Sequence, residues 1–400
     1  MKVLIYGDGN SAHIIAPMLA AAGQEVSLFT LGAPSRWCQE VSAEYWNEHH
    51  EKVFTVKGRL AAVSDRPEML VPQAEVIILC MPVSQYRPAL HEIARHLRPE
   101  QQVCLGTIYG QGGFNWMVEE VQRKYRLPNI KYFAFGLIPW IARIGEYGRR
   151  GITYGGKASN CVALHPDSDF ALLKQEIFDN ISLRWFGAGE AQQSPDFISL
   201  TLSVDNQIIH PTRCYALAQV SGGQWDSAES VPYFYRDYDQ LSVEYLQRLD
   251  DDYSLIRQEL RRRFPAKTFP FMLDYLALER FSYASSNTDI LSTFVNSKTL
   301  REIRTPVVQL PNGKWGFDIT HRFFSDDIYY GVCIAKWFAQ QLDLETPMAD
   351  EILHWVEGLK GEKLLDEQKR LLTASPALAA PFASGLPEYY GRRDLAALLD

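Results

Sequence analysis

The first thirty residues decide the fold of this chain, beginning with the apolar run Lys2-Val-Leu-Ile-Tyr6 and the turn Gly7-Asp8-Gly9-Asn10-Ser11-Ala12. The run has the length and the continuous hydrophobicity of a strand that is buried on both faces. The turn fits the pattern GxGxxG/A, and an alanine-rich helical stretch at residues 13–22 follows it. Residues 25–30 have the composition of a second strand. This order is the context in which the glycine motif binds a dinucleotide.

The residues of the turn each have a physical role in such a motif. Gly7 permits the tight turn, Gly9 lets the backbone approach a pyrophosphate, and Ala12 lets the helix pack close to the strand. The helix N-terminus offers N–H groups and the positive end of its dipole to the phosphates. We therefore predict that the chain binds NAD or NADP. The residues expected to contact the dinucleotide are Gly7, Gly9, Asn10, Ser11, Ala12, Thr30, Arg36 and Pro82.

The choice between NAD and NADP depends on the end of the second strand. NAD-binding folds usually carry an Asp or Glu there, about 20 residues beyond the glycines, which binds the ribose 2′-hydroxyl. This chain has Phe29-Thr30-Leu31-Gly32 at that place and Arg36 just beyond it. Arg36 fits a solvated surface residue at least as well as it fits a partner for a 2′-phosphate. The sequence therefore favours NADP only slightly.

Further apolar runs predict a doubly wound sheet. Buried strands are expected at residues 74–81, 102–107 and 130–135. Strand-like runs that are expected to extend this sheet in antiparallel fashion occur at residues 151–154, 161–164 and 182–186. The predicted first domain is therefore an α/β Rossmann domain with extra strands, over residues 1–188.

Helical periodicity dominates beyond Gly187-Ala188-Gly189. Long helices are predicted at residues 197–220, with a possible bend at Pro211, and at residues 239–264, 328–342 and 348–359. Residues 189–400 are therefore expected to form an all-α domain that binds the substrates and completes the active site.

Composition limits the class of function. The chain has 400 residues, more than one ordinary domain, and a formal net charge of −8, which argues weakly against nucleic-acid binding. The six cysteines form no CxxC pair, so neither a disulfide framework nor a metal site is expected. No apolar run reaches the roughly 18 residues of a membrane span, and no signal peptide is recognised. We expect a cytoplasmic monomer or homodimer without a membrane partner.

Two segments of the C-terminal half carry side chains suited to proton transfer. In Asn206-Gln207-Ile208-Ile209-His210-Pro211, the first and fifth residues share one helix face. The second segment is His321-Arg322-Phe323-Phe324-Ser325-Asp326-Asp327-Ile328. Hydride transfer to a carbonyl or an imine needs a proton donor with a pKa near neutrality, and histidine is suited to this. A carboxylate can fix the histidine tautomer, and an arginine can hold the carboxylate of a keto acid.

The same residues also have ordinary structural explanations. His210 fits a core histidine with satisfied hydrogen bonds. Ser325 or Asp326 fits a helix N-cap, where acids also suit the helix dipole. Capping does not account for Arg322. His210, Asp327 and Arg322 would together supply a proton donor, its carboxylate partner and a keto-acid ligand, although their spacing does not show that they meet.

At these residues the sequence resembles the octopine/nopaline (opine) dehydrogenase family, most closely the octopine type. The resemblance extends over nearly the whole chain, and it includes GDGNSAH at residues 7–13, LIPWIARIGEYG at 137–148, IIHP at 208–211 and HRFFSDDI at 321–328. It implies that an amino acid or amine condenses with a 2-oxo acid such as pyruvate through an imine, which NAD(P)H reduces to an N-(carboxyalkyl) amino acid.

The resemblance also assigns roles to residues. It implies that His210 and Asp327 are catalytic, with Asp326 as a close competitor for Asp327. Arg322 is then the ligand of the keto acid. Asn206, on the same helix face as His210, is predicted to be a further substrate contact. The amine is not identified. The aromatic side chains that could shape its pocket, or simply pack in the core, are Trp140, Tyr233, Phe234 and Tyr235.

Two other functions remain open. One is an NADP-dependent carbonyl reductase of the ketopantoate or hydroxyacid type, which would use a lysine early in the helical domain. No lysine occurs between Gly189 and Ser230. The other is a non-catalytic NAD(P)-binding sensor, for which His210 and Arg322 would be dispensable.

Overall fold

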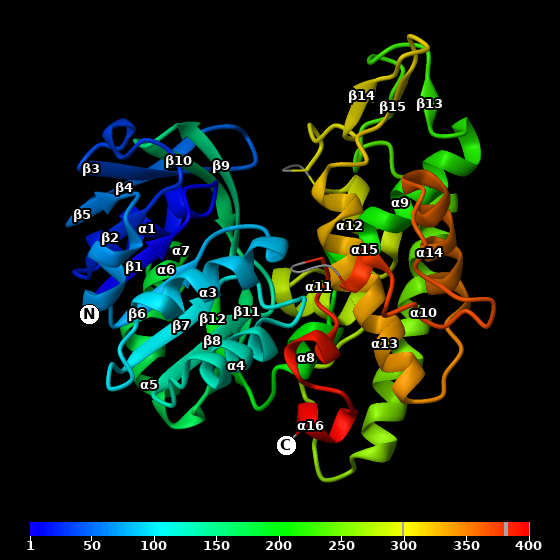
Figure 1. The fold of residues 1–400 in the computed structure, drawn as a ribbon. Coiled ribbons are helices and arrows are strands. Elements are labelled where there is room, and N and C mark those ends of the chain that lie inside the picture. The colour runs from blue at the N-terminus through cyan, green and yellow to red at the C-terminus, as the bar shows by residue number, and fades with distance from the viewer. Residues whose placement is uncertain (298–299, 380–382, 400) are drawn as a thin grey trace. The chain divides into compact units, whose positions relative to one another are not determined.

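The chain divides into two compact units in a computed structural model that describes residues 1–297, 300–379 and 383–399 (Figure 1). The first unit comprises Met1–Thr201 and Phe281–Ala284, and the second comprises Leu202–Arg280 and Ser285–Asp400. The first unit continues past the expected boundary at Ala188 because strand β12 (Glu190–Ser194) pairs with β11 (Ser159–His165) and so belongs to its main sheet.

The main sheet has eight strands in the order β12-β11-β8-β7-β6-β1-β2-β5. Its remaining strands are β1 (Lys2–Tyr6), β2 (Glu25–Phe29), β5 (Ala62–Ser64), β6 (Val76–Leu79), β7 (Val103–Thr107) and β8 (Ile130–Phe135). These six pair in parallel with their neighbours, and β11 pairs antiparallel to β8. Every residue of β6 and β7 is buried, so both faces of the sheet are covered. The predicted doubly wound domain is confirmed.

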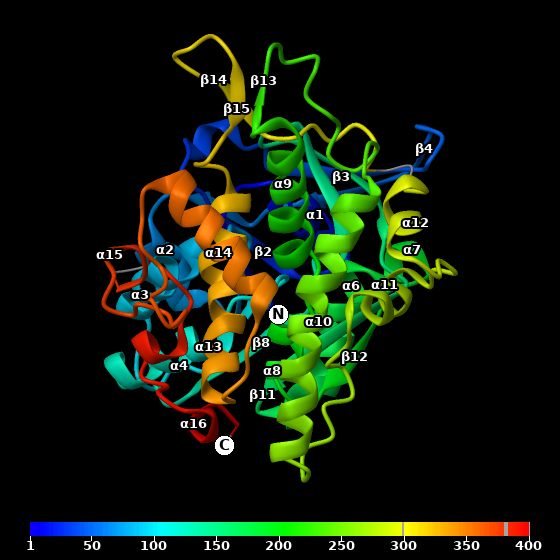
Figure 2. The same ribbon diagram turned by 90° about the vertical axis from the view of Figure 1, so that its right-hand side faces the viewer.

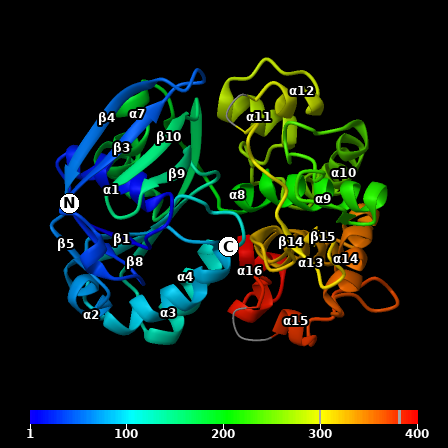
Figure 3. The same ribbon diagram turned by 90° about the horizontal axis from the view of Figure 1, so that it is seen from above.

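A second sheet of four strands was not expected from the sequence. Figure 3 shows its strands side by side in the order β4 (Lys52–Arg59), β3 (Glu40–Trp46), β10 (Arg150–Gly156) and β9 (Trp140–Glu146). The prediction that residues 151–154 extend the main sheet is therefore wrong. Helix α1 (Ala12–Ala21) packs against strands of both sheets. Gly151 permits this, since a Cβ there would lie 2.5 Å from the His13 carbonyl oxygen.

The run at residues 182–186 is a helix and not a strand. Helix α7 (Leu183–Phe186) begins after Ser182, whose carbonyl oxygen accepts hydrogen bonds from the N–H groups of Trp185 and Phe186. The Phe186 ring meets the Tyr45 ring edge-on with 5.5 Å between centroids. Short apolar runs do not distinguish strand from helix by periodicity, and here packing on the second sheet decides.

The second unit is mainly helical, as predicted, and Figure 2 shows four of its helices running alongside one another. These helices are α9 (Asn206–Ser221), α10 (Gln240–Arg263), α13 (Cys333–Gln341) and α14 (Pro347–Lys360). A π-helical turn, Ile328–Val332, precedes α13. The unit also contains a small sheet that the all-α prediction did not include, formed by β13 (Gln224–Trp225), β15 (Trp315–Phe317) and β14 (Val307–Gln309).

The long helix expected at residues 197–220 is two helices. Helix α8 (Ile198–Leu202) ends before Ser203, whose hydroxyl donates a hydrogen bond of 2.6 Å to the Phe271 carbonyl oxygen. The Asp205 carboxylate then accepts a hydrogen bond from the Asn206 N–H and begins α9. The side chains of these two residues therefore compete with helix continuation, as short polar side chains do.

Two further observations concern the cysteines and the hydrophobicity of the helices. The six cysteines are all free thiols. Among the residues that the structure describes, no helix combines the length and the hydrophobicity that are needed to cross a membrane.

Candidate active site

His210 and Asp327 meet in the interior of the second unit. The Asp205 cap begins α9 so that His210 lies in its second turn, and Asp327 directly precedes the π-helical turn. The distance between His210 Nδ1 and Asp327 Oδ2 is 2.7 Å. Asp327, and not its neighbour Asp326, is therefore the carboxylate that contacts this histidine.

Burial dominates the electrostatics of this pair. The exposed fractions of His210 and Asp327 are 1% and 2%. Burial lowers the pKa of His210 well below its ordinary value, and the positive charge of Arg322 adds to this effect while the Asp205 carboxylate opposes it. Burial likewise raises the pKa of Asp327 well above its ordinary value. Burial thus disfavours a charge on either group alone. The imidazole and the carboxylate therefore favour a state in which they share one proton and carry no net charge together.

Aromatic side chains enclose the imidazole of His210. The Phe323 ring stacks on it with 3.6 Å between centroids, and the Phe234 ring meets it edge-on at 5.5 Å. The hydroxyl of Tyr235 lies 3.0 Å from His210 Nε2, so both ring nitrogens have a partner. In the sequence, Tyr235 is only one of several aromatic residues that could shape a pocket or pack in the core. No spacing rule connects it to His210, because the contact depends on the path of the loop after α9.

Arg322 and Asn206 lie in the same unit as this pair. Arg322 begins a short 3-10 helix, Arg322–Phe324, and its side chain is exposed. Its guanidinium carbon lies 5.4 Å from the centroid of the Phe323 ring, the ring that stacks on His210. Asn206 is the first residue of α9, half-buried and one turn before His210. The second unit therefore holds all four residues to which the sequence analysis assigned catalytic or substrate-binding roles.

The glycine turn has the tight backbone geometry that the motif predicts. Gly7 has a φ of 127°, and a Cβ there would lie 2.5 Å from the Cys80 carbonyl oxygen. Only glycine fits this position. Ala12 is fully buried where α1 meets the sheet, and the Ser11 side chain makes no capping hydrogen bond at the helix N-terminus. Asn10 Oδ1 accepts a hydrogen bond of 2.9 Å from the Ile144 N–H. Pro82 comes three residues after the end of β6 and directly precedes the short helix Val83–Gln85.

Asp8 places a carboxylate at the end of β2, where the sequence showed no acid. Its Oδ2 atom accepts hydrogen bonds from the Thr30 hydroxyl at 2.5 Å, the Tyr147 hydroxyl at 2.9 Å and the Gly32 N–H at 3.3 Å. Burial alone would raise the pKa of Asp8, but these hydrogen bonds outweigh it and the pKa is lowered. The Arg36 guanidinium lies 4.2 Å above the Tyr147 ring. The acid that binds a ribose 2′-hydroxyl was expected at the end of β2 in the sequence. Here the carboxylate at that place belongs to Asp8, which lies inside the glycine motif.

His13 connects the glycine turn to the loop between β9 and β10. Its Nε2 atom accepts a hydrogen bond of 2.8 Å from the Gly148 N–H, and its Nδ1 atom lies 2.9 Å from the Gly9 carbonyl oxygen. A backbone N–H only donates, so Nε2 carries no proton and Nδ1–H is the donor. Burial lowers the pKa of His13, which keeps it in this neutral form.

Comparison with known proteins identifies relatives of the chain that carries this glycine turn and this histidine–aspartate pair. Residues 193–360 match the family model described as NAD/NADP octopine/nopaline dehydrogenase, alpha-helical domain. An opine dehydrogenase of Haliotis discus hannai is 22% identical over 92% of this chain and 93% of its own length. An octopine dehydrogenase of Mizuhopecten yessoensis is 22% identical over 91% of each chain.

A solved structure supports the same relationship at the level of the fold. Octopine dehydrogenase with NADH and L-arginine superposes with a TM-score of 0.81 at 20% identity, and the match covers 100% of this chain and 98% of the other. The likeness therefore includes both units and is not confined to the glycine turn.

Proposed function

Because this chain belongs to the octopine/nopaline dehydrogenase family, we propose that its reaction is the reductive condensation of an amine with a 2-oxo acid. The chain is an NAD(P)-dependent oxidoreductase of the opine dehydrogenase type. In the proposed reaction, the amino group of an amino acid or amine and the keto group of a 2-oxo acid such as pyruvate lose water to form an imine. Bound NAD(P)H supplies the hydride that reduces the imine carbon. The product is a secondary amine, an N-(carboxyalkyl) amino acid.

The contact between His210 and Asp327 carries this proposal. Reduction of the imine requires a proton at nitrogen, and dehydration of the preceding carbinolamine requires one at oxygen. A buried imidazole and carboxylate 2.7 Å apart can hold such a proton away from water. In our proposal His210 is the proton source, and Asp327 fixes its orientation and stabilises its charged form.

Arg322 and Asn206 are assigned to the substrates. We propose that Arg322 binds the carboxylate of the keto acid, because its guanidinium is exposed next to the ring that stacks on His210. Asn206 precedes His210 by one helical turn and is proposed to donate a hydrogen bond to the same substrate.

The cofactor preference that we propose is NADH. The sequence favoured NADPH slightly because of Arg36. However, the Asp8 carboxylate lies at the end of β2, where a ribose 2′-hydroxyl is usually bound. Its pKa is lowered, so it carries a negative charge. A 2′-phosphate at that place would face this carboxylate, and like charges repel. Arg36 would then contact the adenosine from above the Tyr147 ring.

The proposed reaction is tested by NAD(P)H oxidation with pyruvate or 2-oxoglutarate, with and without a panel of L-amino acids and simple amines. We expect oxidation only when keto acid and amine are both present. Oxidation with the keto acid alone would instead indicate a hydroxyacid or ketopantoate-type reductase. Tight dinucleotide binding without oxidation in any combination would support the sensor function.

A further inference from the structure

The nitrogen of His210 that faces away from Asp327 is already occupied. His210 Nε2 lies 3.0 Å from the Tyr235 hydroxyl, and the imidazole itself is 1% exposed. One face of the ring is covered by Phe323, and Nδ1 is held by Asp327. A substrate atom therefore cannot reach His210 directly in this arrangement. The polar atom in contact with Nε2 is the hydroxyl oxygen of Tyr235, a residue that is 6% exposed against 1% for His210.

We propose that Tyr235 delivers the proton of His210 to the substrate, an inference that rests on the proposed imine reduction. In this step the Tyr235 O–H bond breaks and a bond forms between that proton and the imine nitrogen. The His210 Nε2–H bond breaks at the same time, and its proton restores the tyrosine hydroxyl. The electron pair of the new C–H bond comes from the NADH hydride. His210 changes from imidazolium to neutral imidazole, and atoms and charges balance.

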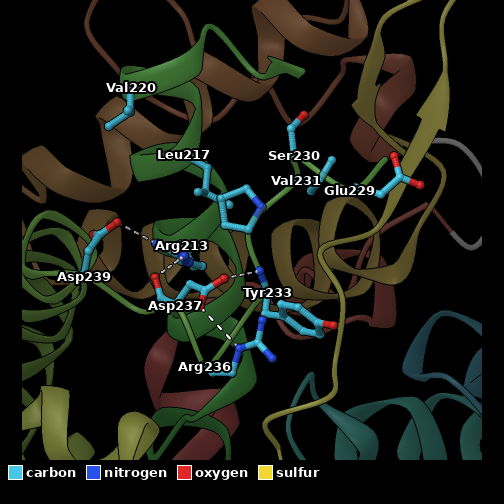
Figure 4. A pocket seen from close by; sticks show the side chains of 11 residues that line it. Arg213, Leu217, Val220, Glu229, Ser230, Val231, Tyr233, Arg236, Asp237 and Asp239 are labelled. Carbon is cyan, nitrogen blue, oxygen red and sulfur yellow. Dashed lines mark hydrogen bonds and ion pairs between the residues drawn. The ribbon is translucent and has the colours of Figure 1, made fainter. Parts of the chain in front are cut away.

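The segment that carries Tyr235 is fixed to the helix that carries His210. Arg213, three residues after His210 on α9, is fully buried and donates hydrogen bonds to the Phe234 carbonyl oxygen at 3.2 Å and the Asp237 carbonyl oxygen at 2.6 Å. The same guanidinium pairs with the Asp239 carboxylate at 2.9 Å. Figure 4 shows Arg213, Asp237 and Asp239 in the wall of a pocket of about 360 Å³. Arg213 is therefore a positioning residue for Tyr235.

The ring of Tyr235 is held from a second side. It stacks on the Phe294 ring with 5.8 Å between centroids, and its neighbour Phe234 donates a backbone hydrogen bond of 2.9 Å to the Ile303 carbonyl oxygen. Two segments that are distant in the sequence thus fix the position of this ring. Such constraint is what a proton donor needs, because proton transfer depends steeply on the distance between donor and acceptor.

The charged groups around the pair fit a proton relay. Asp327 and Asp205 favour a protonated His210, whereas Arg322 and His321 act against it. Asp205 lies at the N-terminus of α9, whereas Asp327, Arg322 and His321 all lie in the segment that begins at His321. The positive charge of Arg322 lowers the pKa of His210 and so favours loss of its proton, which is the direction of the proposed relay.

The substitution Tyr235→Phe tests this role, with Tyr238→Phe as the matched control. The Tyr238 ring also stacks on Phe294, at 4.1 Å, and its hydroxyl makes no hydrogen bond with His210. We expect Tyr235→Phe to lower kcat about 100-fold, the usual contribution of a general acid, with little change in the KM of the keto acid. The deuterium isotope effect with 4-deuterated NADH should increase, because the chemical step becomes slower than product release. Any defect that slows hydride transfer raises this isotope effect, so the readout that separates a proton donor from a purely structural role is the pH profile of the enzyme with 3-fluorotyrosine at position 235.

A Tyr235→Phe enzyme with near wild-type kcat and an unchanged isotope effect would overturn the proposal. Failure of the proposed function is distinguishable, since the wild-type enzyme would then form no secondary amine. If Tyr235→Phe does not fold, 3-fluorotyrosine at position 235 keeps the shape and acidifies the hydroxyl. The alkaline limb of the kcat profile should then move to lower pH, and an unmoved limb would contradict the relay.

Discussion

Asp326 and Asp327 show, at the scale of single residues, how position decides the role of a side chain. The two carboxylates are adjacent in sequence and both are buried, yet only Asp327 contacts His210. A carboxylate at Nδ1 favours the tautomer and the charged form that a proton donor needs. The sequence alone left this choice open, because one residue of shift along the turn before α13 exchanges the two side chains.

The neighbouring acids provide a matched pair of variants. We expect Asp327→Asn to lower kcat by about 100-fold or more, because an amide does not stabilise the imidazolium of His210. Asp326→Asn should keep a kcat near that of the wild-type enzyme. Both values come from steady-state kinetics with the preferred amine and keto acid. Equal losses in the two variants would remove Asp327 from its assigned role.

Arg322 is expected to act on substrate binding more than on chemistry. Arg322→Ala should raise the KM of the keto acid by about 10- to 100-fold, since a charge-assisted contact to a carboxylate contributes roughly 1.5–3 kcal/mol. Arg248→Ala is the control, because Arg248 pairs with Glu351 on the surface of α10. A KM that is the same in both variants would show that another group holds the carboxylate.

Asp8 is expected to set the cofactor preference. Asp8→Asn keeps a hydrogen-bond acceptor near Thr30 and Tyr147 but removes the negative charge. The ratio of the Kd values for NADPH and NADH, measured by fluorescence titration, should fall about tenfold, which corresponds to roughly 1.4 kcal/mol. Asp65→Asn, at an exposed acid after β5, should leave the ratio unchanged. A ratio that Asp8→Asn does not alter would exclude contact with the ribose.

At the scale of elements, α1 owes its position to small residues and to His13. It packs against strands of both sheets, and Gly58 and Gly151 admit it closely. His13 then joins the start of this helix to the Gly148 N–H. The loop that carries Tyr147 is thus attached to the glycine turn at two points, one through His13 and one through Asp8.

This attachment predicts a pH dependence of stability. The pKa of His13 is lower in the folded protein than its ordinary value of about 6.5, so the unfolded chain binds more protons below that pH. The stabilisation is complete above about pH 6.5 and is lost as the pH falls toward the depressed folded pKa. Between about pH 7.5 and about pH 5.5, the melting temperature of the wild-type protein should therefore fall more than that of the His13→Gln variant. The exposed His49→Gln variant should behave like wild type; parallel curves for all three proteins would refute the assignment.

Helices and strands could be predicted from the sequence where a single local pattern of residues determines them. The strand, turn, helix and strand at the N-terminus need only the apolar run and two glycines, and the structure confirms them. The break between α8 and α9 was not predictable, because it depends on the distant Phe271 carbonyl oxygen that binds Ser203. The second sheet was missed for a similar reason. Strands β3 and β4 mix charged and apolar residues. Strand β3 pairs with β10, which lies about a hundred residues further along the chain, and β10 in turn pairs with β9.

At the scale of the whole molecule, the two units divide the proposed chemistry between them. The first holds the glycine turn, Asp8 and Arg36, and the second holds His210, Asp327, Arg322 and Tyr235. The division into a Rossmann domain and a helical domain could be predicted from the pattern of the sequence, since helical periodicity replaces short strands along the chain. The proton path could not, because the contact between His210 and Tyr235 joins two side chains with no shared pattern.

In the proposed reaction, the hydride reaches the carbon of an imine formed from keto acid and amine. The most direct measurement is mass spectrometry of the product made with 4-deuterated NADH, carrying the label on its transferred face, from pyruvate and the preferred amine. We predict a secondary amine that contains both carbon skeletons and one deuterium. A labelled hydroxy acid beside unreacted amine would show that the hydride reduces the free keto acid and not an imine.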